Sequence, residues 1–192
     1  MRLTKQEIYT KSNLLSTFRL LLGIPLFFMV YQINNSQSLR YFTLCLMIIA
    51  AITDILDGYL ARKYNEITEF GKIIDPLADK VVIGIIGLQL FRIDEIPGYY
   101  LLIIIGRDLL ILCGGIIISK KIGKVLPSNI IGKITVVTIA LFVLVIVAGL
   151  KPLVPFLYDF LLYLSIILVF ISFIAYIIRA MEVLRQNSYE SI

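Results

Sequence analysis

Long apolar runs separated by short polar segments make up most of this chain. A membrane-spanning α-helix needs about 20 consecutive, mainly apolar residues, and six stretches approach that length. They predict an all-α integral membrane protein with six transmembrane helices, at about Leu14–Tyr31, Tyr41–Leu60 (running on toward Tyr64), Ile73–Phe91, Tyr99–Ser119, Ile130–Leu150 and Leu153–Ile178. Residues 3–11 are expected to form a short N-terminal amphipathic helix at the membrane interface. No repeat, linker or low-complexity segment is visible, so residues 1–192 are predicted to be a single domain.

Lysine and arginine concentrate in alternate connections between the apolar runs. One set of connections holds only Arg40, Arg92 and Lys151. The other set includes both terminal segments and holds twelve basic residues: Arg2, Lys5, Lys11, Arg62, Lys63, Lys72, Lys120, Lys121, Lys124, Lys133, Arg179 and Arg185. The positive-inside rule therefore predicts that both termini are cytoplasmic, which agrees with an even number of crossings. The expected location is the cell membrane, with several passes.

The overall composition argues against a soluble domain and against several kinds of site. Of the 192 residues, 59% are hydrophobic and 16% are charged, too few to give a soluble core a polar surface. Histidine is absent, which removes the commonest general base and the usual zinc ligand. Cys45 and Cys113 lie far apart in apolar runs, so neither a zinc site nor a redox motif is expected. No signal-peptide cleavage pattern is evident, and no cleavable signal peptide is expected.

Four aspartates stand out at the ends of the second and third predicted helices. Asp54 and Asp57 are three residues apart, and Asp75 and Asp79 are four apart, so each pair shares one helical face. The connection between the two helices is predicted to be cytoplasmic, which makes them antiparallel neighbours. Their charged faces are therefore expected to meet near the cytoplasmic end, as a box of four carboxylates.

Four ionised carboxylates in a medium of low dielectric constant repel one another strongly. Divalent cations remove this repulsion, and ligation by oxygen alone favours a hard ion, so Mg²⁺ or Mn²⁺ is expected and Ca²⁺ is an alternative. Four carboxylates are enough to hold two such ions. Ion pairs of this kind bind phosphates and stabilise both sides of a phosphoryl displacement.

The residues between the aspartates fit a phosphate-binding site. Gly58 and Ala61 keep the helix surface free of large side chains, which lets another group approach closely. Arg62 offers a guanidinium suited to phosphate oxygens. Gly71 opens space at the start of the third helix.

The whole stretch reads D-x2-D-G-x2-A-R-x8-G-x3-D-x3-D, from Asp54 to Asp79. It resembles the signature of the CDP-alcohol phosphotransferase family of membrane enzymes, with every fixed position matched and the spacing intact. The resemblance extends to the six-helix layout. It implies two divalent ions, Mg²⁺ or Mn²⁺, that grip the pyrophosphate of a CDP-linked donor while an acceptor hydroxyl displaces CMP. It also implies a homodimer, which is the usual state in this family.

The resemblance implies a role for each residue of the signature. Asp54, Asp57 and Asp75 match metal ligands, and Asp79 matches a metal ligand that also takes the hydroxyl proton. Glycine and alanine positions leave room for the cytidine, and the arginine contacts the donor phosphates. The donor-binding residues implied in this way are Asp57, Gly58, Ala61, Arg62, Gly71 and Asp75.

Three further cations indicate the chemical class of the acceptor. Arg107, Lys133 and Arg179 lie within or near predicted helix ends on the cytoplasmic side, and together they favour an anionic acceptor such as a phosphate monoester. Two alternatives remain open. Arg107 pairs only with Asp108 or with an aspartate of the box, or Arg179 serves, with Arg185, as a positive-inside flank.

Two short segments resemble the subfamily that makes phosphatidylglycerophosphate from CDP-diacylglycerol and glycerol 3-phosphate. Residues 13–19 are similar to an N-x-L-T-x-x-R start, with Ser16 where threonine is usual, and residues 132–135 are similar to a G-K-x-x-T element. Asp108 departs from the pattern, because many members have glutamate there, and an Arg-Asp pair is also similar to cardiolipin synthases. Glycerol 3-phosphate is the predicted acceptor, and phosphatidylglycerol, inositol phosphate and serine are the alternatives.

Other function classes fit less well. A cation or proton transporter predicts acids near the membrane midplane and often an inverted repeat, whereas these acids cluster at one end. An intramembrane aspartyl protease typically has a GxGD element, which is absent. The expected partners are therefore CDP-diacylglycerol, an anionic alcohol, membrane lipid and a second copy of the chain. No nucleic-acid partner is expected.

Overall fold

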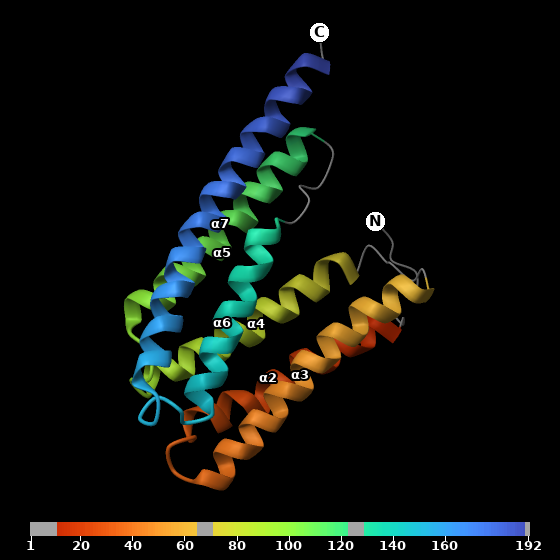
Figure 1. The fold of residues 1–192 in the computed structure, drawn as a ribbon. Coiled ribbons are helices and arrows are strands. Elements are labelled where there is room, and N and C mark those ends of the chain that lie inside the picture. The colour runs from red at the N-terminus through yellow and green to blue at the C-terminus, as the bar shows by residue number, and fades with distance from the viewer. Residues whose placement is uncertain (1–10, 65–70, 123–128, 191–192) are drawn as a thin grey trace. The chain divides into compact units, whose positions relative to one another are not determined.

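The computed structural model describes residues 11–64, 71–122 and 129–190, with side chains over 17–56, 80–119 and 129–185. These residues form helices and no strand. The helices are α2 (Lys11–Tyr31), α3 (Gln37–Tyr64), α4 (Gly71–Arg92), α5 (Gly98–Ile122), α6 (Ile130–Val147) and α7 (Pro155–Glu190) (Figure 1). Each predicted apolar run corresponds to one of these helices, so the predicted helix order is confirmed. The proposed interfacial helix at residues 3–11 falls almost entirely outside the described residues.

Several helices are suited to a bilayer by length and composition. Within the described residues, four stretches are long and apolar enough to cross a membrane: Gln37–Leu56 in α3, Gly98–Ser119 in α5, Ile130–Val147 in α6 and Pro155–Arg185 in α7. The described apolar part of α2, Thr17–Tyr31, is shorter. Most of the first half of α4 lies outside the residues whose side chains are described. Four candidate spans are therefore established, and the prediction of six remains a prediction.

Many large apolar side chains lie on the surface of the described residues, and several polar side chains are buried beside the apolar core. Large apolar side chains such as Leu102, Phe156 and Phe170 are exposed, whereas Thr43 and Thr135 are fully buried. Many of the buried hydroxyls bond to a carbonyl of their own helix, as Thr43 does to Leu39 O at 2.8 Å. Lipid is a favourable solvent for the exposed apolar surface, and a polar group is most stable away from it. This arrangement is typical of a membrane protein.

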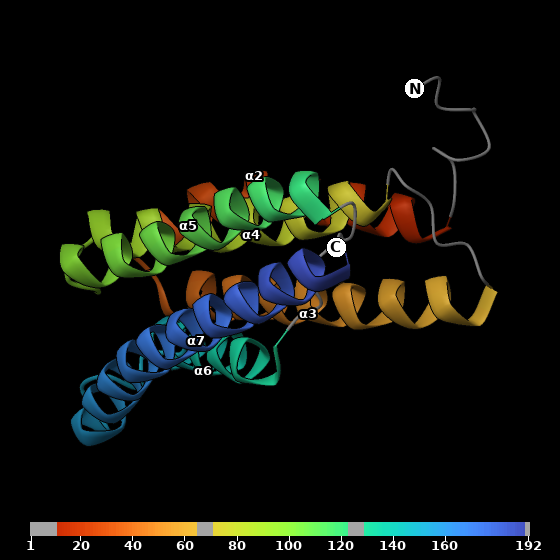
Figure 2. The ribbon, with the colours of Figure 1, turned by 90° about the horizontal axis from the view of Figure 1, so that it is seen from above.

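The chain forms two compact units, residues 1–95 and 96–192. In the first unit, α2 packs against both α3 and α4 (Figures 1 and 2). Its core includes Leu26, Val30 and Leu90, all fully buried. Asn34 in the loop after α2 accepts from Arg40 Nη2 of α3 at 2.7 Å and donates from Nδ2 to Glu95 Oε1, at the end of the unit, at 3.4 Å.

In the second unit, α7 packs against both α5 and α6 (Figures 1 and 2). The aromatic rings of Tyr100 and Phe142 meet edge to face, with 5.0 Å between their centroids, and both side chains are buried. α6 begins after Asn129, whose Oδ1 accepts from the Ile131 N–H at 3.1 Å. It ends at Val147, before Leu150, because Gly149 takes a positive φ of 73° that closes the helix terminus.

A regular polar seam joins α5 to α7. The Tyr100 hydroxyl lies 2.9 Å from Ser165 Oγ, and Arg107 Nη2 lies 3.0 Å from Ser172 Oγ. The second pair follows the first by seven residues on each helix, which is about two helical turns. The two helices therefore run in the same direction, as Figure 1 shows.

Candidate active site

Asp54 is the first aspartate of the signature, and it is held by an arginine from another helix. Its Oδ1 lies 2.9 Å from Nη1 of Arg19, which α2 places against α3. The Arg19 side chain is 3% exposed, whereas that of Asp54 is 51% exposed. A buried guanidinium thus fixes one edge of an accessible carboxylate. A carboxylate has about four acceptor positions, so this contact leaves capacity for a further ligand.

The other aspartates lie on the helices that the sequence predicts for them. Asp57 follows Asp54 within α3, and Asp75 and Asp79 lie within α4. The helical spacing on which the shared-face prediction depends is therefore confirmed for both pairs. The side chains of these three aspartates lie outside the described residues, as do those of Gly58, Ala61, Arg62 and Gly71, so the box itself stays a prediction.

The donor set is compatible with a hard divalent ion. All four acids offer oxygen, which Mg²⁺ and Mn²⁺ prefer. Asp54 presents half of its surface outward while its orientation is fixed by Arg19. An oriented carboxylate with spare acceptor capacity is what a metal site requires of each ligand.

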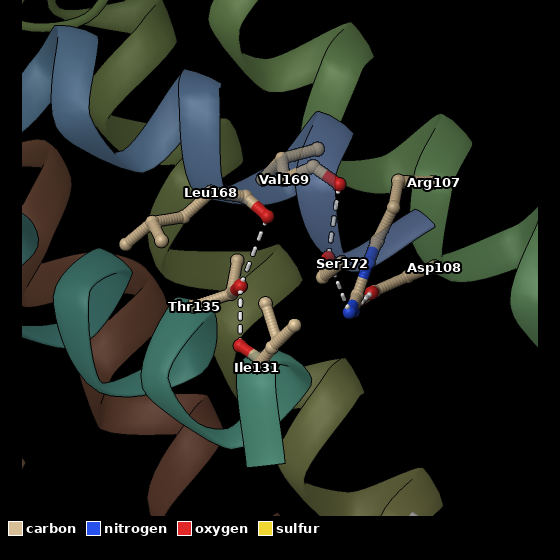
Figure 3. A network of polar contacts seen from close by, with 7 residues as sticks. All are labelled: Arg107, Asp108, Ile131, Thr135, Leu168, Val169 and Ser172. Atoms are coloured by element: carbon tan, nitrogen blue, oxygen red, sulfur yellow. Dashed lines mark hydrogen bonds and ion pairs between the residues drawn. The ribbon is translucent and has the colours of Figure 1, made fainter. Parts of the chain in front are cut away.

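Arg107 is the centre of a second polar cluster, in the other unit (Figure 3). Its side chain is 13% exposed. Nη1 lies 2.6 Å from Asp108 Oδ1, and Nη2 donates to Ser172 Oγ at 3.0 Å. The pair with Asp108, which was one of the alternatives to acceptor binding, is therefore present, but Asp108 is not the sole partner because Ser172 of α7 also bonds to Arg107. Among the described residues, the buried Arg107 Nε has no hydrogen-bond partner.

The first turn of α6 approaches the same guanidinium. A Cβ added at Gly132 would lie 3.4 Å from Arg107 Nη2, so the guanidinium borders this turn of the helix. Lys133 is the next residue, and its side chain is exposed. The N-terminal turn of a helix carries a partial positive charge. Guanidinium, helix terminus and lysine thus gather positive charge at one end of α6.

Thr135 anchors this turn of α6 to α7. Its hydroxyl contacts Ile131 O at 2.8 Å and Leu168 O at 3.2 Å (Figure 3). Leu168 precedes Ser172 by about one turn of α7. The same part of α7 therefore supports both α6 and Arg107. In the G-K-x-x-T element, Gly132 therefore borders Arg107 and Thr135 joins α6 to α7, in addition to any role of Lys133.

Arg179, the third predicted acceptor cation, lies on α7 and is half-buried. It follows Ser172 by seven residues, about two helical turns. The structure brings Arg107 and the first turn of α6 together, and it places Arg179 further along the same supporting helix.

Sequence reasoning assigned no role to three of these residues. Arg19 had a signal, since it is a charged residue inside an apolar run, but nothing in the sequence names its partner. Ser172 lies in an apolar helix where serine is common, and Gly132 opens the G-K-x-x-T element, but neither residue indicated its contact in the sequence. Only the packing of α5, α6 and α7 reveals that both contact Arg107.

Comparison with known proteins agrees with the sequence signature. The sequence profile of the CDP-alcohol phosphatidyltransferase family matches residues 9–182. A protein of Aquifex aeolicus named CDP-diacylglycerol–glycerol-3-phosphate 3-phosphatidyltransferase is 36% identical over 135 residues, which cover 69% of this chain and 72% of that protein. A Wigglesworthia glossinidia brevipalpis protein of the same name is 32% identical over 190 residues, 90% of this chain and 96% of its own length.

A Rickettsia typhi protein, again of that name, is 39% identical over 99 residues. That alignment covers 52% of this chain, and the chain spans about half, 54%, of the relative's length. The family match runs from before the first aspartate pair to beyond Arg179, so it includes both clusters described above. The chain belongs to the CDP-alcohol phosphatidyltransferase family.

Proposed function

We propose that this chain transfers a phosphatidyl group from CDP-diacylglycerol to glycerol 3-phosphate and releases CMP. The observation that carries the proposal is the complete aspartate signature on α3 and α4, in a chain matched by the family over residues 9–182. The names of the relatives from Aquifex, Wigglesworthia and Rickettsia support this choice of donor and acceptor.

The reaction assigns distinct tasks to the residues of the first unit. The acceptor hydroxyl oxygen bonds to the phosphorus that carries diacylglycerol, and the bond from that phosphorus to the bridging oxygen breaks. CMP leaves with the bridging oxygen and its electron pair. Asp79 takes the hydroxyl proton, and Arg62 stabilises charge on the donor phosphates.

Two Mg²⁺ or Mn²⁺ ions are proposed as cofactors, held by Asp54, Asp57, Asp75 and Asp79. When bound, they would neutralise charge on the pyrophosphate and on the departing CMP. The Arg19–Asp54 contact supports this proposal, because metal ligands are usually oriented by an outer partner. Gly58, Ala61 and Gly71 are proposed to leave room for the cytidine.

Arg107, Lys133 and Arg179 are proposed to bind the acceptor phosphate. Arg107 is held at the first turn of α6, where helix terminus and exposed lysine add positive charge. Arginine offers two parallel donors to phosphate, and the gathered positive charge favours an anionic alcohol over serine, whose ammonium group cancels its carboxylate charge at neutral pH. The site is proposed to face the cytoplasm, in a six-span homodimer with cytoplasmic termini.

Phosphatidylglycerol is the second candidate acceptor, because of Asp108. Its carboxylate lies 2.6 Å from Arg107 and partly compensates the guanidinium charge. A phosphodiester carries one negative charge, fewer than the phosphate monoester of glycerol 3-phosphate at neutral pH. The reduced positive charge therefore favours the diester more than a site without Asp108 would.

CMP release from CDP-diacylglycerol in detergent micelles tests the proposal. The purified chain would be assayed with Mg²⁺ and with glycerol 3-phosphate, phosphatidylglycerol, inositol phosphate or serine in turn. Turnover with glycerol 3-phosphate, lost on chelation and restored by Mg²⁺, is expected. Turnover with phosphatidylglycerol alone would support the second candidate. If a folded protein releases no CMP with any acceptor, both candidate functions are wrong.

A further inference from the structure

We infer that Ser172 is a positioning residue that fixes the guanidinium of Arg107, and through it the affinity for the anionic acceptor. The inference rests on the proposed function, since it assigns Arg107 to the acceptor. Nothing in the signature or in the short conserved-looking elements points to Ser172. It is identified by its contacts alone.

The hydroxyl of Ser172 is oriented before any ligand binds. Its side chain is 2% exposed. The hydroxyl donates to Val169 O at 2.9 Å, which uses its single hydrogen. Only lone pairs remain, and one of them accepts from Arg107 Nη2 at 3.0 Å. The backbone of α7 thus makes Ser172 an obligatory acceptor for a cation (Figure 3).

Arg107 needs this bond because its other partner is on its own helix. Asp108 holds Nη1, but it is the next residue on the same helix, so this contact does not join Arg107 to another element. Ser172 is on α7, and it joins the guanidinium to a second helix through Nη2. Two anchors on different nitrogens fix the plane of the fork, on which two-point recognition of phosphate depends.

The environment of the guanidinium supports a functional reason for its position. Nε is buried and, within the part of the chain that the structure describes, has no hydrogen-bond partner. A buried unsatisfied donor is unfavourable for stability. Gly132 leaves only van der Waals space beside Nη2. The contacts therefore fix where the guanidinium lies without satisfying all its donors.

Ser165 provides a matched control on the same helix. It is fully buried, its hydroxyl donates to Leu162 O at 2.8 Å, and it lies 2.9 Å from the Tyr100 hydroxyl of α5. Ser165 and Ser172 thus make the same kind of bond within α7 and the same link to α5. They differ in the partner, which is a neutral phenol in one case and a cation in the other.

The test measures acceptor and donor KM by CMP release, for the full chain in micelles with Mg²⁺ and the acceptor it uses. Ser172→Ala is expected to raise the acceptor KM by roughly tenfold, the lower end for a hydrogen bond to a charged group. The donor KM is expected to stay within about twofold, and Ser172→Thr is expected to restore most of the acceptor affinity, since it keeps the hydroxyl. Ser165→Ala should lower the midpoint of thermal unfolding about as much as Ser172→Ala does, but it should leave the acceptor KM unchanged.

A second comparison isolates the route through Arg107. On an Arg107→Ala background, Ser172→Ala is expected to have no further effect on the acceptor KM. An active wild-type protein whose acceptor KM is the same with Ser172→Ala, or is raised equally by Ser165→Ala, would overturn the inference and leave the proposed function intact. A folded wild-type protein that releases no CMP with any acceptor would overturn the proposed function and this inference with it.

Discussion

Two arginines lie inside apolar helices of this chain, and their surroundings differ in an instructive way. Arg19 in α2 is paired with Asp54, which comes from a different helix. Arg107 in α5 is paired with its own neighbour, Asp108, and among the residues whose side chains are described a serine hydroxyl ties it to another helix. A charge within a membrane helix is costly and is usually retained for a purpose. The partners indicate that the two purposes are different.

Arg19 has the environment of a residue that organises other protein groups. Its guanidinium is almost completely buried, and the carboxylate that it holds is part of the signature. Arg107 is more exposed, and its partners fix its plane without enclosing it. We therefore expect changes at Arg19 to affect the donor and metal side of the reaction, and changes at Arg107 to affect the acceptor side.

The largest effect is expected at Asp57, a proposed metal ligand three residues after Asp54 in α3. Asp57→Asn should lower CMP release by about 1000-fold, because electrostatic stabilisation of the phosphate charge is lost. The assay is CMP release at saturating substrate and Mg²⁺. Asp159→Asn, at an exposed aspartate near the start of α7, is the control and should be active. Substantial turnover by Asp57→Asn would contradict the two-metal assignment.

The comparison of the two arginines predicts a smaller effect at Arg19, one that is selective for the metal side of the reaction. Arg19→Leu should reduce activity by about 10- to 100-fold, as expected when the partner of a metal ligand is removed. The Mg²⁺ concentration for half-maximal rate should change, while the acceptor KM should not. Arg92→Leu, at an exposed arginine of the same unit, is the control. An altered acceptor KM with an unchanged Mg²⁺ dependence would contradict the assignment of Arg19 to the metal side and of Arg107 to the acceptor side.

At Arg107 the opposite selectivity is expected. Arg107→Ala should raise the acceptor KM by about 10- to 100-fold, since it removes hydrogen bonds to a charged group. The donor KM and the Mg²⁺ dependence should stay within about twofold. Lys151→Ala, at a cation that lies 4.7 Å from the Tyr158 ring, tests whether any loss of positive charge has this effect. Equal rises in both KM values would assign Arg107 to the donor or to structure.

The smallest effect is expected at Gly132, which only borders Arg107. A Cβ there would lie 3.4 Å from Nη2, an ordinary contact, so Gly132→Ala should change the acceptor KM little. Gly132→Val adds two further carbons and should raise the acceptor KM by roughly fivefold, as overpacking costs about 1 kcal/mol or more. Steady-state kinetics with varied acceptor measures both. If the two variants behave alike, space beside the guanidinium is unimportant.

Much of the fold was predictable because apolar runs of sufficient length have few alternatives to a helix in lipid. Helix ends were less predictable. The last helix continues to Glu190, well past the predicted Ile178, because the polar segment after the span contains neither proline nor glycine and can stay helical. Hydrophobicity indicates where a membrane span ends, but it does not indicate how far the helix continues beyond the span.

The candidate site was predictable where sequence spacing decides geometry. Residues three or four apart on a helix share a face, so the helical placement of each aspartate pair followed from the sequence, while the meeting of the two pairs stays a prediction. The contacts of Arg19 with Asp54 and of Arg107 with Ser172 join residues 35 and 65 positions apart. They depend on how whole helices pack, which no local pattern in a single sequence encodes.

The identity of the lipid product tests the central claim most directly. The purified chain would be given CDP-diacylglycerol, Mg²⁺, and equal concentrations of glycerol 3-phosphate and phosphatidylglycerol, and the lipids would be analysed by mass spectrometry. Phosphatidylglycerophosphate as the main product, formed in step with CMP, is the predicted result. Cardiolipin as the only new lipid would contradict the assignment of Arg107 and the first turn of α6 to a phosphate monoester.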